Sequence, residues 1–249
     1  MPPPSGIIVP LYIYPLSPTT WAPLYESISA YPHLHFLVVV NPNSGPGASP
    51  APDTNYTREI SKLNSYGNVD TVGYIAIGYG KKPLQDVLEE IQTYATWAND
   101  YERTGLGVGG IFFDETPNHY SAEAAEYLAV LQSFIKDTPA FLGNRLVIHN
   151  PGTPPDAALT RTLKPDLILT CEESYARYRS TEVQRRLHDL HHDRIRSGYV
   201  IHSVPMHHLR PLVLELRHRG AYLFVTEFFG EFYERFGPRS WTAFMEALQ

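Results

Sequence analysis

Short apolar segments alternate with helical segments eight times along this chain, and this alternation limits the fold more than any other feature of the sequence. Most of the apolar segments are continuous, which is typical of strands buried on both faces of a parallel sheet. The expected strands are residues 7–13, 35–40, 72–77, 110–113, 145–149, 166–170, 199–202 and 222–226. The expected helices are residues 20–30, 56–66, 84–101, 121–136, 156–163, 181–196, 206–218 and 239–248.

Eight strand–helix units in 249 residues match the usual size of a barrel. We therefore expect an α/β fold, a single (β/α)8 TIM barrel that occupies residues 1–249 as one domain. A doubly wound open sheet is the alternative, but it usually has fewer strands and a glycine-rich phosphate loop after the first. The first strand here ends instead with Tyr12, Ile13, Tyr14 and Pro15. Four glycines at the starts of expected strands are predicted to be left-handed: Gly105, Gly143, Gly198 and Gly220.

The composition is that of a globular protein with an acidic balance. Hydrophobic residues make up 43% of the chain, and the net charge is −6. This charge argues against nucleic acid or an anionic membrane as the partner, because both require clustered Lys and Arg. Aromatic residues reach 12% and include 17 tyrosines, which suits a cleft that stacks the flat faces of sugar rings.

The sequence also bears on where the protein resides. No apolar stretch reaches the 18 residues of a membrane span, so we expect none. The first six residues lack the basic region and long apolar core of a signal peptide. The protein is therefore expected either in the cytoplasm or, if a signal has been removed, secreted or associated with the cell wall. The single cysteine, Cys171, excludes an intramolecular disulfide and is interpreted as a core residue.

Acidic residues follow three of the expected strands at the carboxyl-terminal face, where barrel active sites are built. Asp114 and Glu115 follow the fourth strand, Glu172 and Glu173 follow the sixth, and Glu227 follows the eighth. Two carboxylates that face each other are what glycoside hydrolysis requires. The alternative is that these acids cap the helices that follow, where the helix dipole would stabilise them.

Polar and aromatic residues at the other strand ends suit a sugar cleft, because amides and histidines hydrogen-bond hydroxyl groups while tyrosines stack on rings. The candidate substrate-binding residues are Tyr12, Asn41, Tyr74, Tyr79, Asn150, Tyr175, His202 and Glu227.

Histidine clusters raise the question of a metal site. His33 and His35 have the H-x-H spacing of metal-dependent hydrolases, but they precede the second strand, on the face opposite to the active site. His188, His191 and His192 share one face of an expected outer helix, for which solvation is the favoured interpretation and a zinc site the alternative. We expect no metal and no cofactor.

Six segments together resemble the spherulin-type glycoside hydrolases, a family related to the endo-α-1,4-galactosaminidases. They are residues 10–15, 40–47, 73–75, 110–115, 150–152 and 170–172, and they run through six of the eight units. The resemblance implies an endo-acting, retaining hydrolase of α-1,4-linked galactosamine or N-acetylgalactosamine polymers such as galactosaminogalactan. It also implies a polysaccharide partner, and we expect a monomer.

Carried over by motif, the resemblance makes Asp114 the nucleophile or anionic stabiliser, Glu172 the general acid/base and Glu115 a residue that orients or tunes its neighbour. Two departures from the family pattern, Cys171 for a bulky aromatic and Glu173 for a small residue, leave Glu173 as an alternative acid. Strand alternation is expected to place Glu172 on the same face as Thr170 and Ile168.

Other classes of function remain as alternatives. One is a non-catalytic glycan-binding or spore- or cell-wall-associated barrel protein. Another is a metal-dependent amidohydrolase, against which the missing histidine pair at the first strand counts. For a hydrolase, carboxyl groups about 5–5.5 Å apart predict retention of configuration, and a separation of about 6.5–9.5 Å predicts inversion.

Overall fold

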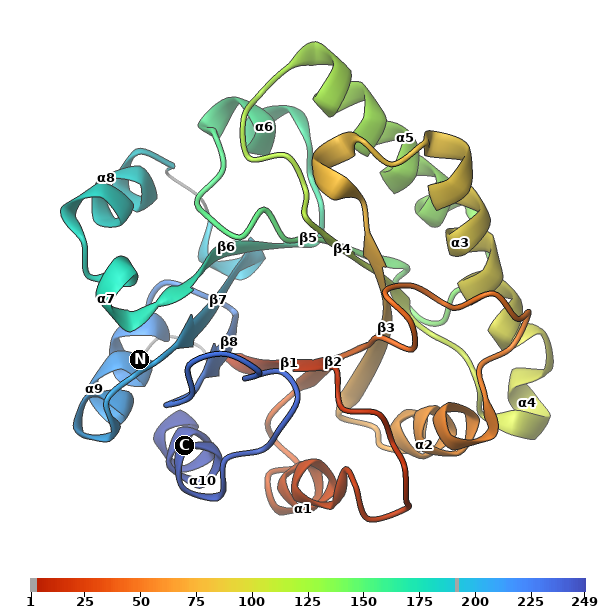
Figure 1. Cartoon of the computed structure of the whole chain (residues 1–249), viewed down its shortest axis with the longest axis horizontal. Helices are drawn as coiled ribbons and strands as arrows, with labels where there is room; N and C mark the ends of the chain where they lie inside the picture. The colour runs from red at the N-terminus through yellow and green to blue at the C-terminus, as the bar shows by residue number, and fades with distance from the viewer. Residues whose placement is uncertain (1–3, 191–192) are drawn as a thin grey trace.

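The computed structural model describes residues 4–190 and 193–249, which form a closed barrel of eight parallel strands surrounded by helices (Figure 1). Each strand pairs with its neighbours in sequence order, and β8 closes onto β1. The (β/α)8 prediction is therefore confirmed. The strands are β1 Gly6–Leu11, β2 Phe36–Val40, β3 Val69–Ala76, β4 Gly110–Asp114, β5 Leu146–His149, β6 Leu167–Ser174, β7 Ser197–His202 and β8 Tyr222–Val225.

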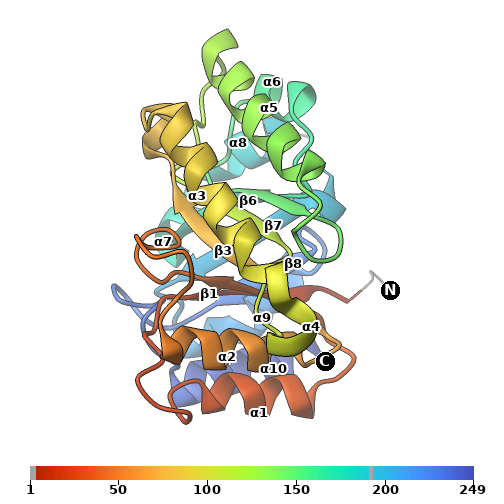
Figure 2. The same ribbon diagram turned by 90° about the vertical axis from the view of Figure 1, so that its right-hand side faces the viewer.

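The helices form the outer layer, and Figure 2 shows α1, α2 and α10 together on one side of the barrel. Within the described ranges, no helix combines the length and apolarity needed to cross a bilayer. The α-helices are α1 Ala22–Ala30, α2 Thr54–Asn64, α3 Leu84–Thr96, α4 Tyr101–Thr104, α5 Ala122–Asp137, α6 Ala157–Thr162, α7 Tyr175–Tyr178, α8 Thr181–Leu190, α9 Met206–Leu216 and α10 Pro238–Leu248. The described residues also include three 3₁₀ turns: η1 Gly78–Gly80, η2 Trp97–Asp100 and η3 Arg194–Arg196.

Two of the expected helices are shorter than the sequence predicted. The expected helix 84–101 divides into α3, η2 and α4. The expected helix 181–196 ends at Leu190 as α8, and residues 194–196 form η3. Neither the short α7 nor η1 was predicted, since segments this short carry too few residues to show a period.

The apolar strands are buried on both faces, as their continuous hydrophobic runs predicted. All five residues of β2 are buried, because one set of side chains fills the barrel and the other packs under the helices. Side chains that pack tightly against the backbone explain two of the glycines. A Cβ at Gly198 would lie 2.7 Å from Leu169, and one at Gly220 would lie 2.7 Å from Tyr199. The left-handed prediction holds for Gly105 and Gly143, but it was wrong for these two, where space rather than φ requires glycine.

Strand β6 contains an irregularity that decides which of its acids faces the barrel interior. Leu169 pairs with Gly198 of β7, but the next pair is Cys171 with Tyr199, so Thr170 is passed over. Glu172 consequently pairs with Val200, two residues beyond Gly198, and shares a face with Leu169.

The expected placement of Glu172 on the face of Ile168 was therefore wrong. Ile168 pairs with Ser197, three residues before the partner of Glu172, so the two side chains lie on opposite faces. Had the strand been regular, Glu172 would have turned toward the helices and Cys171 toward the interior. The bulge reverses this arrangement, and β6 extends to Ser174 instead of ending before the acids.

Candidate active site

A cleft of about 270 Å³ opens at the carboxyl-terminal ends of the strands. This volume lies near the lower end of the range for small-molecule sites, about 300–1,000 Å³. The cleft collects residues from β4, β6, β7 and the loops that follow β3, β5 and β8. Its lining consists of Tyr79, Asp114, Glu115, Asn150, Pro151, Gly152, Glu172, His202 and Phe232.

Asn150 joins the two central carboxylates. Its Nδ2 donates to Oδ1 of Asp114 at 2.8 Å and to Oε2 of Glu172 at 2.5 Å. The amide is 5% exposed, and its Oδ1 accepts from the backbone N–H of Gly152 at 3.0 Å, which fixes which end of the amide faces the acids. The two bridged oxygens can be separated by no more than the length of both bonds, about 5.3 Å.

Three donors converge on Asp114, the last residue of β4. Besides Asn150, the hydroxyl of Tyr74 donates to Oδ2 at 2.6 Å and the backbone N–H of Glu115 donates to Oδ1 at 2.9 Å. Hydrogen bonds to an ionised acceptor are the stronger class, so this arrangement holds a carboxylate in one orientation.

Glu172 faces Asp114 in a more enclosed position. Burial raises the pKa of Glu172, the negative charges of Asp114 and Glu173 raise it further, and hydrogen bonds from Tyr233 and Asn150 oppose these effects. The carboxyl group therefore keeps its proton to a higher pH than an ordinary glutamate. A protonated carboxyl opposite an ionised one is the pairing that acid catalysis of glycoside cleavage requires.

These acids do not cap helices, which decides against the capping alternative for the central pair. The N-cap of α5 is Ser121, whose side chain accepts from the N–H of Ala124 at 3.0 Å. The N-cap of α7 is Ser174, which accepts from the N–H of Arg177 at 3.3 Å. The helix ends after β4 and β6 are thus satisfied by serines, and the carboxylates remain directed to one another.

Glu115 and Tyr79 form one rim of the cleft, and both have left-handed backbones with φ of 53° and 58°. The N–H of Tyr79 donates to the carbonyl of Glu115 at 2.6 Å, which ties the two strained residues together. Such conformations cost energy and concentrate at functional sites. The Glu115 side chain is exposed and lines the cleft, and the Tyr79 ring is 57% exposed above it.

Tyrosine and histidine side chains surround the carboxylates. The ring of Tyr12 meets those of Tyr74 and Tyr233 edge-on, with centroids 5.3 and 5.1 Å away. His202 stacks on Phe232 at 4.5 Å, and its Nδ1 lies 2.9 Å from Oγ of Ser203. Burial lowers the pKa of His202, so the ring is neutral at neutral pH and presents a flat apolar wall with one polar edge.

Five of the predicted binding residues do not line this cleft. Tyr74 still reaches the site through its hydrogen bond to Asp114, and Tyr12 packs against Tyr74. The other three lie elsewhere. The carbonyl of Asn41 accepts from the hydroxyl of Tyr56 at 3.0 Å, and within the described part of the chain its buried Oδ1 has no hydrogen-bond partner. Tyr175 begins α7 and stacks on His208 at 5.3 Å. Glu227 lies two residues beyond the end of β8, outside the cleft lining.

The sequence did not point to Tyr233 or Phe232. The hydroxyl of Tyr233 donates to Oε1 of Glu172, and Phe232 forms part of the cleft wall. Both belong to the segment 226–237, which follows β8 and contains no helix or strand. The only signal was the aromatic content of that segment.

The histidines considered as metal ligands are placed elsewhere. His35 Nε2 lies 3.2 Å from Asp70, and its Nδ1 lies 3.0 Å from the hydroxyl of Tyr222 at the start of the barrel. His188 lies on α8, whereas His191 and His192 fall outside the described residues. Across residues 4–190 and 193–249, no three His, Cys, Asp or Glu side chains are grouped closely enough to hold a metal ion.

A family model and a solved structure match this chain over nearly its whole length. Residues 6–248 match the model of the Spherulin4 family, spherulation-specific family 4. Spherulin-4 of Physarum polycephalum is 37% identical over 157 residues, which are 61% of this chain and only 41% of that longer protein. The crystal structure of Aspergillus clavatus Sph3 in complex with GalNAc superposes with a TM-score of 0.92 and 39% identity over 99% of this chain and 98% of that one. The family expected from the motifs is therefore confirmed, and the chain belongs to spherulation-specific family 4.

Proposed function

We propose that the chain is a glycoside hydrolase that cleaves α-1,4-linked galactosamine or N-acetylgalactosamine polysaccharide, acting within the polymer and with retention of configuration. The observation that carries the proposal is the amide bridge between Asp114 and Glu172, which brings an anion and a carboxyl of raised pKa together in an open cleft. The GalNAc complex of the similar Aspergillus clavatus Sph3 supports the choice of sugar.

The reaction divides between the two carboxyl groups. Glu172 donates its proton to the glycosidic oxygen, and the C–O bond of the leaving chain breaks as that oxygen becomes a hydroxyl. Asp114 attacks the anomeric carbon from the opposite side and forms a glycosyl ester. Glu172, now ionised, removes a proton from a water molecule that attacks the same carbon and releases Asp114. The upper limit of about 5.3 Å on the separation of the bridged oxygens lies below the spacing of inverting enzymes, about 6.5–9.5 Å, and so supports retention.

The 2-acetamido group of an N-acetylated substrate cannot replace Asp114 as the nucleophile. In an α-linked GalNAc unit this group lies on the same face of the ring as the departing oxygen, whereas attack must come from the opposite face. Asp114 is therefore the nucleophile for both the acetylated and the deacetylated polymer. Tyr74 and Asn150 hold the Asp114 carboxylate in position for this attack. Glu115 adds a negative charge beside Tyr74, which is consistent with tuning rather than direct attack.

The direct test is cleavage of α-linked galactosaminoglycan, its deacetylated form and neutral α-glycans, followed by reducing-end and mass-spectrometric analysis. We expect Asp114→Asn and Glu172→Gln each to lose at least about a hundredfold in kcat/KM, because each removes a participating group. Activity of Asp114→Asn within a few-fold of wild type would remove Asp114 from the mechanism.

Glu173→Gln is the matched control, because Glu173 adjoins Glu172 but pairs with Ile201 and lies on the opposite face of β6. Its nearest cation is Arg177, 3.9 Å away. This variant is expected to retain activity. An inactive Glu173→Gln beside an active Glu172→Gln would exchange the two roles. Absence of cleavage by the folded wild type on every glycan, with binding retained, would instead favour a glycan-binding barrel.

A further inference from the structure

We propose that Tyr233 is a positioning residue for the acid, and that the segment 226–237 is thereby a working part of the active site. Tyr233 acts through the carboxyl group of Glu172 and takes no direct part in bond cleavage. This inference rests on the proposed hydrolase function for its kinetic consequence, but its physical basis can be measured without a substrate.

The barrel leaves an opening through which Tyr233 reaches the site. β1 pairs with β2 along five residues, up to Leu11 with Val40, but it pairs with β8 only at Gly6–Tyr222 and Ile7–Leu223. Nearer the mouth, the N–H of Tyr12 donates to the carbonyl of Tyr233 at 3.1 Å. The segment after β8 has thus replaced β8 itself as the neighbour of β1 at the level of the carboxylates.

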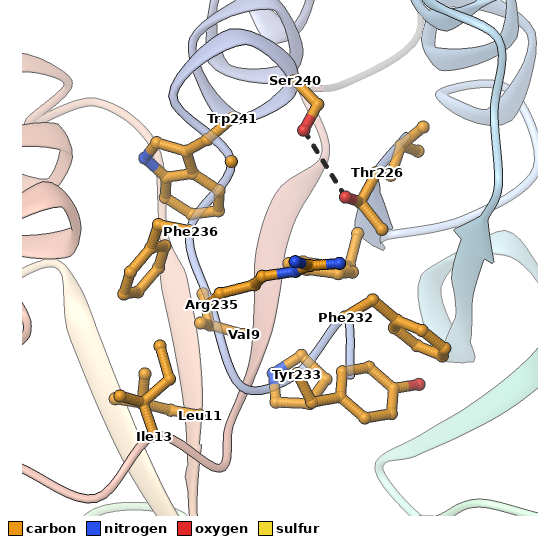
Figure 3. Close-up of a pocket in the computed structure, with 14 residues that line it drawn as sticks. Val9, Leu11, Ile13, Thr226, Phe232, Tyr233, Arg235, Phe236, Ser240 and Trp241 are labelled. Atoms are coloured by element: carbon orange, nitrogen blue, oxygen red, sulfur yellow. Dashed lines mark hydrogen bonds between the residues drawn. The ribbon is translucent and has the colours of Figure 1, made fainter. Parts of the chain in front are cut away.

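Packing holds the ring of Tyr233 in this opening. Its centroid lies 4.1 Å from that of Phe232 and 5.1 Å from that of Tyr12, both in edge-on geometry. Figure 3 shows Tyr233 beside Phe232, with its hydroxyl directed away from Phe236 and Trp241. The crevice behind the ring is lined mainly by apolar residues and is small, with a volume of about 10 Å³.

The hydroxyl group completes the environment of Glu172. Oε2 accepts from Asn150, and Oε1 accepts from Tyr233, so each oxygen has one protein donor and the carboxyl plane cannot rotate freely. Both hydrogen bonds favour the ionised form of Glu172, so they lower its pKa against the effect of burial.

Removal of this donor should disturb the titration of Glu172. A donor to a carboxylate stabilises its ionised form, so its loss raises the pKa of the acid. The other titratable groups around Glu172 stay in place in such a variant; from the surrounding strands they are Tyr12, Tyr74, Asp114, Cys171, Glu173 and His202. A shift in Tyr233→Phe can therefore be assigned to the lost hydroxyl.

The test is to titrate Glu172 in Tyr233→Phe and to monitor the titration by ¹³C NMR of labelled glutamate carboxyl groups. The Glu172 signal is assigned by its absence from the spectrum of Glu172→Gln. We expect the pKa of Glu172 to rise by about one unit, which is the size of one charge-assisted hydrogen bond. The basic limb of the profile of kcat/KM against pH should move to higher pH by the same amount, because Glu172 must be protonated to act.

Tyr178→Phe is the matched control, since Tyr178 is also buried and its hydroxyl donates to Oε1 of Glu215 at 2.6 Å, away from the cleft. This variant should leave the Glu172 titration and the pH profile unchanged. If Tyr233→Phe fails to fold, 3,5-difluorotyrosine at position 233 keeps the ring and hydroxyl. Its stronger donor should move the Glu172 pKa downward.

An unchanged Glu172 titration in the folded Tyr233→Phe variant, or an equal shift in the Tyr178 control, overturns the positioning role. An NMR shift without any glycan cleavage by the wild type leaves the positioning of Glu172 intact and refutes only the proposed hydrolysis. The two failures are thereby distinguished.

Discussion

Replacement of Asn150 by alanine tests whether the amide bridge organises the site. Both hydrogens of Nδ2 are committed, one to Asp114 at 2.8 Å and one to Glu172 at 2.5 Å. Asn150→Ala removes both bonds and leaves two carboxyl groups facing each other across an empty position. One substitution therefore removes the amide that both separates the two acids and donates a hydrogen bond to each of them.

The expected magnitude follows from these two contacts. A hydrogen bond to a charged group contributes about 1.5–3 kcal/mol. Loss of one such hydrogen bond in the transition state corresponds to about a tenfold to hundredfold fall in kcat/KM. Loss of both hydrogen bonds corresponds to a fall of about a thousandfold or more. Water that enters the vacated space would restore part of this, so we expect a fall of about a hundredfold. The basic limb of the profile should also move to higher pH, because Glu172 loses a donor to its ionised form.

The assay is kcat/KM on the polymer between pH 4 and 9, with thermal unfolding measured on the same samples. Asn64→Ala is the matched control, because Asn64 Nδ2 also bridges two acceptors, the carbonyls of Gly105 and Gly107, both at 2.9 Å. That variant should lose stability without losing turnover. Activity of Asn150→Ala within threefold of wild type across this range would refute the reasoning.

Two further predictions concern stability and polymer binding. Burial raises the pKa of the Glu172 carboxyl in the folded protein above its ordinary value of about 4.3. The free energy of unfolding is therefore lowered in full above the folded-state pKa, where the buried group is ionised, and it is not lowered below a pH of about 4.3. Glu172→Gln should therefore unfold at a higher temperature than wild type at pH 8 and at nearly the same temperature at pH 4; a lower melting temperature at pH 8 would contradict this. Phe229 is 82% exposed beside His202, so Phe229→Ala should raise KM on the polymer with little change in melting temperature. Ile195→Ala is the control, because Ile195 is an apolar residue on η3, before β7, that is 64% exposed. It should change neither KM nor the melting temperature, and equal effects of Ile195→Ala and Phe229→Ala would exclude a subsite at Phe229.

Local pattern was sufficient for the barrel and for one of the two central acids. The continuous apolar runs predicted all eight strands, because a strand buried on both faces has no polar side to show. Asp114 could be placed because it ends such a run, where parallel strands bring their carboxyl ends to one face. The same rule predicted that Asn150 lies at this face. Its role as a bridge could not be predicted, because it depends on contacts with Asp114 of β4 and Glu172 of β6.

The tertiary structure alone decided how the second acid is presented and what surrounds it. Regular alternation in β6 would have turned Glu172 outward, and the sequence carries no sign of the bulge at Thr170, since a register shift depends on which residues of β7 are available for pairing. Tyr233 lies 61 positions from Glu172 and reaches it because β1 and β8 separate near the mouth. Sequence periodicity describes neighbours two to four residues apart, whereas these contacts arise from the closure of the barrel, which joins the first strand to the last.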